Sequence, residues 1–403
     1  MKKLYILFLC STLAAGMISC GEDGLRTPLE KNSQAPDPVT NVHVENLPGK
    51  ARISYTVPVQ QDLLYVKAVY KLATGRAMEV KASYYENSLL VEGFADEGEH
   101  EVTLYAVNRS EKASAPVPVT IRPLEAPIWE VYRSMEVGPA FGGIRVTADN
   151  PERSDLAILV MQKNEYGEWD IHPNSIYTAT DSIAHTLRDA ALDTVDQAFA
   201  FTIRDRWLNY TDTLYATIKP LYEVAIPKSG YAGMNLPGDA PHHPSTSMQG
   251  MWDGNIIDWP SIYMTQNAHP GIHVITFDIG RLAKLSRIVI WDYPEYFSSG
   301  GFGRTYYYLG NLKEFEIWGS DSPPSDGSFD NWHLLGRYNA VKPSGLPFGQ
   351  QNNEDYQTAN AGFSWDFDVA APKVRYLRIR STRNWGGTSY MAIAEIQVYG
   401  DPR

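Results

Sequence analysis

The sequence predicts an all-β protein built from sandwiches, and three observations carry this prediction. From Val39 onward, segments in which apolar and polar residues alternate are separated by turn residues every eight to twelve positions. Alternation with a period of two, as in Arg52–Val57 and Glu101–Val107, is typical of strands with one buried face. No long apolar pattern with the helical period of about 3.6 residues occurs. The chain also contains an internal repeat that has the length of one sandwich.

The internal repeat indicates two similar units in tandem. Asn108-Arg109 and Thr120–Leu124 recur as Asp205-Arg206 and Thr217–Leu221, with an offset of 97 residues in both cases (205 − 108 and 217 − 120). A repeat of this length corresponds to a small β-sandwich and is too long for a solenoid unit. The first unit resembles the fibronectin type III fold, an immunoglobulin-like sandwich, and the second resembles a diverged relative. Neither contains the cysteines of an immunoglobulin domain.

The N-terminus resembles the signal peptide of a bacterial lipoprotein. Lys2 and Lys3 precede the apolar run Leu4–Ile18, which is too short to span a bilayer. The run ends in Met17–Cys20, which resembles a lipobox, so cleavage would leave Cys20 as an acylated N-terminal residue. An ordinary signal peptide with an incidental cysteine is the alternative.

The distribution of charged residues and of cysteines indicates where the protein is located and which classes of partner it can bind. The acidic residues of Gly21–Asp23 resemble the export signal of bacteroidete-type lipoproteins, and a solvated tether that Ser33–Pro38 continues is the alternative. The net charge of −12, which becomes −14 without the two leader lysines, argues against nucleic acid as a partner. Cys10 and Cys20 both lie in the leader, so we expect no disulfide in the mature chain. We predict a protein anchored in outer-membrane lipid through its acylated cysteine and facing the cell exterior.

Four segments near the C-terminus follow the order of motifs in one known sandwich family. They are the loop Trp252–Asn255 with Trp259, the strand pair Val274–Gly280 and Ile288–Ile290, the strand Lys313–Asp321 with Trp332, and the closing strands Val374–Ile379 and Ile393–Gly400. These segments resemble discoidin domains, also called coagulation factor 5/8 C-terminal type or galactose-binding-like domains. Their alternation agrees with the half-buried strands of a jelly-roll sandwich. The whole order is similar to surface lipoproteins of bacteroidete-type polysaccharide-utilisation systems.

The predicted fold is therefore two tandem immunoglobulin/fibronectin III-like sandwiches followed by a discoidin-like jelly-roll sandwich. The predicted segments are a lipoprotein signal peptide at 1–19, a lipidated flexible tether at 20–37, a fibronectin III-like sandwich at 38–124, a second, diverged sandwich at 125–224 and a discoidin-like domain at 225–403. Each sandwich has a length that a single hydrophobic core can serve.

The resemblance implies that ligands bind at loop tips on one end of the last sandwich, where aromatic residues are frequent. A sugar offers a C–H face that stacks on an aromatic ring and hydroxyl groups that need planar donors and acceptors. The predicted carbohydrate-binding residues are Trp385, Arg383, Asn384, Tyr296, Phe297 and Phe302. The alternative for Trp385 is a ring that packs inward, and the alternative for Tyr306–Tyr308 is a strand with its middle ring outward.

The resemblance also implies a structural Ca²⁺ ion between the early loop and the closing strand. The positions that match its ligands are Asp253, Asp258 and Glu395. Hard oxygen ligands suit this ion, although Asp258 stands where the family has a neutral hydroxyl residue. The alternative is an Asx-turn at Asp253 and a solvated Glu395.

These features predict a non-catalytic surface protein that captures oligo- or polysaccharide, beside the transporter components of an uptake system. The chain has no Gly-x-Ser-x-Gly, His-Glu-x-x-His or phosphate-loop motif, and its nine histidines form no clear metal set. The alternative function is an adhesin or assembly component whose discoidin-like domain binds a protein partner. A remote glycosidase ranks third.

Overall fold

The structure is a computed structural model of the 403-residue chain. It describes residues 31–32, 34–189, 194–268, 271–295, 303–388 and 390–403. The chain forms two compact units: the first comprises Met1–Glu136, Thr147–His185 and Phe199–Ala216, and the second comprises Val137–Val146, Thr186–Ala198 and Thr217–Arg403. Strands make up 49% and helices 6% of the structure, which confirms the all-β fold class.

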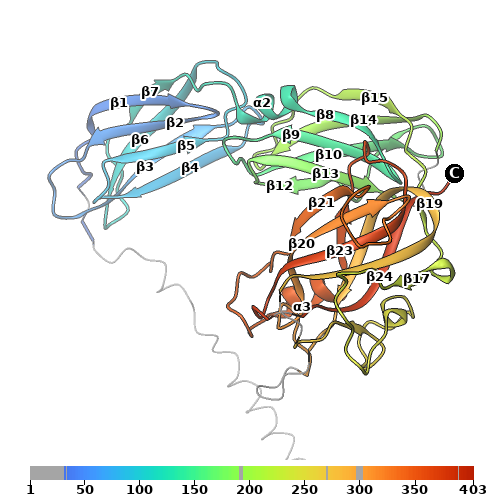
Figure 1. Ribbon diagram of the computed structural model, residues 1–403. Helices are drawn as coiled ribbons and strands as arrows, with labels where there is room; N and C mark the ends of the chain where they lie inside the picture. The colour runs from blue at the N-terminus through green and yellow to red at the C-terminus, as the bar shows by residue number, and fades with distance from the viewer. Residues whose placement is uncertain (1–30, 33, 190–193, 269–270, 296–302, 389) are drawn as a thin grey trace, which may run out of the picture. The chain divides into compact units, whose positions relative to one another are not determined.

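The first unit begins with a sandwich of two antiparallel sheets (Figure 1). One sheet has the order β1-β2-β5 and the other has the order β4-β3-β6-β7. Ile53, Val66 and Leu104 show how alternate residues enter one shared core, where each is fully buried. The strands are β1 (Thr40–Leu47), β2 (Lys50–Thr56), β3 (Leu63–Lys71), β4 (Ala77–Ser83), β5 (Ser88–Glu92), β6 (His100–Asn108) and β7 (Val117–Ile121).

Helix α2 (Pro127–Ser134) and eight short strands follow this sandwich. The helix begins at a proline, which tolerates the first helical position because its missing N–H has no helical partner there. One sheet has the order β11-β10-β14-β15, with β12 also paired to β10, and another has the order β13-β9-β8. The strands are β8 (Glu136–Ala140), β9 (Gly143–Asp149), β10 (Leu156–Lys163), β11 (Trp169–Ile171), β12 (Ile176–Thr178), β13 (Ser182–Arg188), β14 (Gln197–Asp205) and β15 (Leu214–Ile218).

The internal repeat corresponds to one structural element that occurs twice in the first unit. Asn108 Oδ1 accepts hydrogen bonds from the N–H groups two and four residues later, and Asp205 Oδ1 does the same at its own positions +2 and +4. The hydroxyl groups of Ser114 and Thr211, again 97 residues apart (211 − 114), each accept a bond from a strand N–H. The repeated residues therefore stabilise the same turn after β6 and after β14.

The second unit contains the C-terminal sandwich, which Figure 1 shows in yellow to red. Its main strand order is β16-β24-β19-β23-β20-β21, with β17 and β22 paired to β19 and β18 paired to β24. The elements are β16 (Val224–Ala225), η3 (Lys228–Gly230), β17 (Ala232–Met234), η4 (Met248–Met251), β18 (Tyr263–Met264), β19 (His273–Asp292), β20 (Leu312–Ser320), β21 (His333–Asn339), α3 (Asn353–Asn360), β22 (Phe363–Asp366), β23 (Val374–Asn384) and β24 (Ala392–Asp401).

The long strand β19 connects the two sets of strands that enclose this core. Its residues up to Asp278 pair with β23 and its residues from Lys284 pair with β24, with an irregular register in between. Gly280 lies in this irregular stretch with φ of 79°, and a Cβ there would lie 2.4 Å from the carbonyl oxygen of Gly230. Glycine is therefore required at the bend for both its backbone conformation and its small size.

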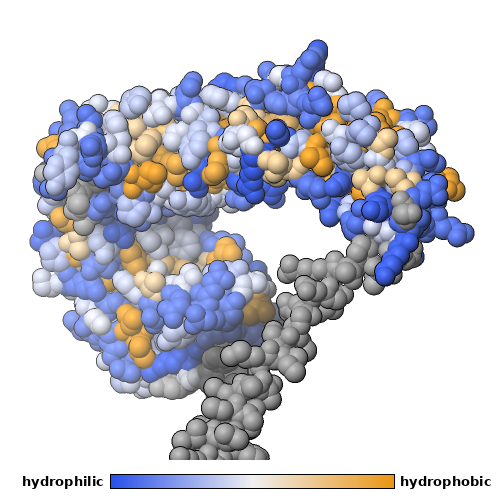
Figure 2. All heavy atoms as spheres, turned by 180° about the vertical axis from the view of Figure 1, so that it is seen from behind, coloured by the Kyte–Doolittle hydropathy of each residue, from blue (hydrophilic) through white to orange (hydrophobic). Residues whose placement is uncertain are grey.

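The surface on the side that Figure 2 shows is mostly hydrophilic, with hydrophobic residues in small separate groups. Apolar residues scattered in this way are normal on a folded chain. Among the described residues, no helix has the length and apolar character that crossing a membrane requires.

Candidate functional site

The ring of Trp385, after β23, packs inward at the loop end of the C-terminal sandwich. It meets Tyr307 edge-on at a centroid distance of 5.3 Å and packs on the cluster of Tyr306, Tyr307 and Ala359. Nζ of Lys313 lies 4.3 Å from the ring centroid, so an ammonium group covers the indole. The buried indole nitrogen has no hydrogen-bond partner within the described part of the chain. Trp385 therefore fits the inward-packing alternative better than an open sugar platform.

Asn384 and Arg383, the neighbours of Trp385, differ in what they can offer a ligand. Asn384 is 3% exposed, and its amide group donates to Thr388 Oγ1 and to the carbonyl oxygen of Tyr390, at 2.6 Å each. Its Oδ1 accepts from the N–H of Thr388, so both polar atoms of the Asn384 side chain are hydrogen-bonded within the loop, and its predicted contact with sugar stays a prediction. The side chain of Arg383 is 59% exposed and pairs with Glu314 at 3.2 Å, so its guanidinium remains at the surface.

Tyr296, Phe297 and Phe302 lie outside the described residues. The chain enters and leaves their segment at Glu295 and Thr305, whose backbone groups exchange two hydrogen bonds of 3.1 and 2.8 Å. The contacts predicted for the three aromatic residues therefore stay predictions.

Trp259, in the loop before β18, has an accessible ring. It is 41% exposed, and its ring meets His243 edge-on at a centroid distance of 5.4 Å. The Nδ1 of His243 accepts a hydrogen bond of 3.2 Å from the N–H of Ser245, which places the proton of the neutral imidazole on Nε2. Trp259 thus combines an accessible aromatic surface with a neighbouring N–H donor.

Charged groups lie beside Trp259 and fix the loop that carries it. Arg304 donates to the carbonyl oxygen of Ile257, and its Nη2 lies 3.4 Å from Oδ1 of Asp258. The side chain of Asp258 is 71% exposed. Asn255 Oδ1 accepts from the N–H groups of Ile257 and Asp258, at 2.9 and 2.8 Å. The loop therefore carries Trp259 next to a carboxylate that pairs with a guanidinium from a different segment.

The tyrosine run 306–308 lies in a bend and not in a strand. Tyr307 is 1% exposed with φ of 53°, so the alternative of a strand with its middle ring outward is wrong. Tyr308 stacks on Phe348, which is 50% exposed, at a centroid distance of 4.7 Å. Nζ of Lys342 donates to three carbonyl oxygens of the loop that carries Phe348, at 2.9–3.1 Å, and burial lowers its pKa. This stacked pair is a second aromatic surface at the loop end.

Glu395, a predicted calcium ligand, is paired with a lysine. It is 2% exposed, so the alternative of a solvated Glu395 is wrong. One carboxylate oxygen accepts from Nζ of Lys228 and the other accepts from the N–H of Gly254 at 3.0 Å. Burial raises the pKa of Glu395, although both hydrogen bonds act in the opposite direction.

The other two predicted calcium ligands are also engaged elsewhere. Asp253 Oδ1 accepts from the N–H of Asn255 at 2.8 Å, which is the Asx-turn of the alternative interpretation, and Asp258 pairs with Arg304. Calcium takes six to eight oxygen ligands. No group of three or more His, Cys, Asp or Glu side chains in the described ranges is arranged to hold a metal ion. The residues present therefore do not fit the predicted calcium site.

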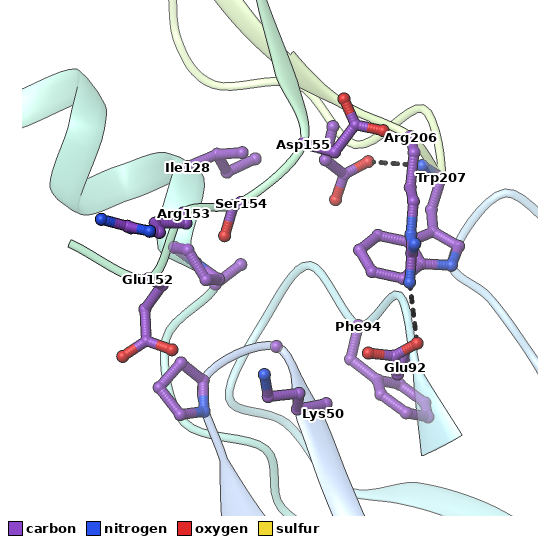
Figure 3. A pocket seen from close by; sticks show the side chains of 15 residues that line it. Lys50, Glu92, Phe94, Ile128, Glu152, Arg153, Ser154, Asp155, Arg206 and Trp207 are labelled. Carbon is purple, nitrogen blue, oxygen red and sulfur yellow. Dashed lines mark hydrogen bonds and ion pairs between the residues drawn. The ribbon is translucent and has the colours of Figure 1, made fainter. Parts of the chain in front are cut away.

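A cavity of about 230 Å³ lies in the first unit (Figure 3). Lys50 and Ser154 point into it. The guanidinium of Arg206 lies 4.2 Å from the ring centroid of Trp207 and pairs with Glu92 at 2.8 Å. The ring also contacts Gly93, where a Cβ would lie 2.8 Å from Cδ1 of Trp207. Because this ring is covered, we assign Trp207 to the packing of the first unit.

Three family models match the chain, and each is described as a domain of unknown function. DUF4959 matches residues 36–123, DUF5126 matches residues 124–229 and DUF5000 matches residues 252–400. A search of curated proteins gives no match.

Several solved structures are similar to the chain. A SusE-like protein is 26% identical with a TM-score of 0.42, over 69% of this chain and 100% of that chain. The family 32 CBM of NanJ from Clostridium perfringens, in complex with galactose, is 20% identical with a TM-score of 0.29, over 44% of this chain and 98% of that chain. The C-terminal domain of a chitobiase from Bacteroides fragilis is 15% identical with a TM-score of 0.29, over 44% of this chain and 97% of that chain.

Proposed function

We propose that the protein binds carbohydrate at the loop end of its C-terminal sandwich and that Trp259 supplies the stacking surface. The observation that carries this proposal is a tryptophan ring, 41% exposed, that lies beside the imidazole of His243. A pyranose ring buries its C–H face on such a surface while its hydroxyl groups remain free for hydrogen bonds. Trp259 was not among the predicted site residues.

The polar groups beside Trp259 match the needs of sugar hydroxyls. Nε2 of His243 donates in the neutral tautomer, the carboxylate of Asp258 accepts, and the guanidinium of Arg304 donates from a second segment. The backbone hydrogen bonds to Asn255 hold the loop before a ligand arrives, which lowers the ordering cost of binding. Donors and acceptors around one accessible ring favour a polyhydroxylated ligand over a purely apolar one.

The wider role follows from the leader and the absence of catalytic motifs in the sequence. We propose that acyl chains on Cys20 hold the protein in the outer membrane, facing the exterior, and that it captures oligo- or polysaccharide without cleaving it. Transporter components of an uptake system are the proposed partners. A surface adhesin that binds a protein is the alternative function.

The experiment that tests the proposal uses a glycan array on the soluble fragment from Gly21, followed by isothermal titration of the best ligand. Trp259→Ala should weaken binding about 30-fold or more, because truncation of a stacking aromatic anchor costs about 2 kcal/mol or more. Tyr166→Ala is the matched control, since Tyr166 is also an accessible ring, 79% exposed, and lies in the first unit. Its affinity should equal that of the wild type.

Two results would contradict this assignment. Full affinity in a folded Trp259→Ala protein would exclude Trp259 as the platform and favour the region of Trp385 and Arg383 or the segment 296–302. The variant Trp385→Ala distinguishes these two sites. Removal of the indole should lower the stability of the protein in either case, but it should lower the affinity for glycan only if the indole stacks on sugar. If the wild type binds no glycan on a broad array, the protein-partner alternative takes the lead.

A further inference from the structure

We infer that the ammonium group of Lys228 occupies a cation position in the C-terminal sandwich, so that this part of the chain needs no calcium ion. Lys228 donates to Oε1 of Glu395, whose other oxygen accepts from the N–H of Gly254. The side chain of Glu395 is 3% exposed and that of Lys228 is 28% exposed. A buried carboxylate such as that of Glu395 requires a counter-charge, and the ammonium group of Lys228 supplies it.

The segment that carries Lys228 is held firmly on strand β24. Lys228 begins the short helix η3, and the N–H of Tyr231 returns to its carbonyl oxygen at 3.0 Å. The hydroxyl of Tyr231 accepts from the N–H of Val398 and donates to the carbonyl oxygen of Ile226, at 3.1 and 3.3 Å. Glu395 lies on the same strand, so β24 fixes the backbone on both sides of the ion pair.

The loop that carries Asp253 also contacts Glu395, through the N–H of Gly254. Trp252 meets Tyr231 edge-on at a centroid distance of 5.8 Å, and both rings are at least nine-tenths buried. Asp253 is close enough to act electrostatically on Glu395. The carboxylate of Glu395 therefore has a hydrogen-bonded ammonium group and a second carboxylate close enough to repel it, and a bound cation would otherwise offset that repulsion.

A divalent ion cannot share this position with the lysine. An ammonium group that already donates to Glu395 repels a second cation and occupies a carboxylate oxygen that the ion would use. The Asx-turn at Asp253 uses one oxygen of the remaining carboxylate. Gly254, which donates to Glu395, directly precedes Asn255, so the carboxylate that Lys228 pairs with also binds the backbone of the loop that carries Trp259.

The test compares melting temperatures of the full chain in EDTA and in increasing calcium chloride. The wild-type Tm should be the same in both, and elemental analysis should find no calcium. Lys228→Met should lower Tm by several degrees, because it leaves the carboxylate of Glu395 buried without its counter-charge. Calcium should then raise the Tm of this variant, since the vacated position can accept a cation. Lys219→Met, which removes an exposed lysine of the same unit, is the matched control and should match the wild type.

Several outcomes would overturn the inference. A wild-type Tm that falls in EDTA, or calcium in the purified protein, would show a metal site that Lys228 does not fill. A Lys228→Met protein that melts like the wild type would show that the pair is dispensable, and one that ignores calcium would show an ordinary ion pair in place of a cation position. If Lys228→Met does not fold, the double variant Lys228→Met/Glu395→Gln removes the unpaired charge and should restore folding without any calcium response. These readouts do not depend on glycan binding, so they stand apart from the test of Trp259.

Discussion

The guanidinium carbon of Arg378 lies 4.6 Å from the ring centroid of Trp332, and both side chains are buried in the second unit. Nε of Arg378 donates to Thr276 Oγ1 at 3.0 Å, and Nη1 donates to the carbonyl oxygens of Gly327 and Ser328. Arg378 therefore ties the centre of strand β23 to the loop that precedes β21.

Replacement of Arg378 by Met should destabilise the second unit by about 3–5 kcal/mol, the usual cost of breaking a buried charge pair. The reason is Asp239, whose carboxylate lies 3.8 Å from the guanidinium and is 4% exposed. Urea unfolding followed by tryptophan fluorescence measures the change. Arg383→Met, at a side chain that is 59% exposed, is the control and should cost less than about 1 kcal/mol. Equal stability of the two variants would contradict the structural role of Arg378.

The pH dependence of stability should carry a contribution from Asp292. Complete burial raises the pKa of this carboxyl from 3.8 to about 8, although the N–H of Leu312 donates to it. Between about pH 4 and pH 8 the folded state keeps a proton that the unfolded state has lost, so this contribution to stability falls as pH rises and is constant above pH 8.

Asp292→Asn removes that titration. The free energy of unfolding of the variant, relative to the wild type, should rise by up to about 1.4 kcal/mol per pH unit between pH 5 and pH 8. Parallel urea titrations at several pH values give this difference directly. A difference that does not change with pH would mean that Asp292 is ionised in the folded protein at neutral pH.

Gly93 should tolerate no side chain, because its Cβ would meet the Trp207 ring at 2.8 Å. Gly93→Ala should therefore cost more than about 1 kcal/mol, from the strain of its φ of 98° and from displacement of the ring. Gly75→Ala isolates the strain, because Gly75 has φ of 81° and open space at its Cβ. Thermal melts of both variants should place Gly93→Ala clearly lower. Coincident melts would show that Trp207 moves aside at little cost.

Cys20→Ala should release the protein into soluble fractions, because stable attachment requires the acyl chains that this cysteine would carry. Membrane fractionation and labelling with palmitate measure this. A wild type that takes up no label, together with a variant that stays in the membrane, would contradict the lipoprotein interpretation.

The sequence was sufficient for features that depend on local pattern. The alternation around Ile53 and Val102 predicted buried strand faces, and both residues are fully buried. The recurrence of Asn108 as Asp205 predicted a repeated element, and both side chains cap the same turn. These features can be predicted from the sequence because strand periodicity and turn hydrogen bonds involve residues close together in the chain.

The candidate site was harder to predict because its residues meet across long sequence separations. Nothing near Glu395 in the sequence indicates Lys228, which is 167 positions away. Trp385 has glycines beside it, as an exposed ring would, yet Lys313 and Tyr307 cover it from other segments. Trp259 had one local signal, its place between Asp258 and Pro260 in a segment rich in turn residues.

Strand β24 has a consequence for how the protein is made. It pairs with β16 at the start of the C-terminal sandwich and with β18, and it covers one edge of β19, which also pairs with β17, β22 and β23. A nascent chain that has left the ribosome only as far as β23 leaves the edges that β24 would cover unpaired, and such edges invite aggregation. This sandwich is therefore expected to close only after synthesis of β24, and a chaperone that binds exposed strands should associate with the chain until then.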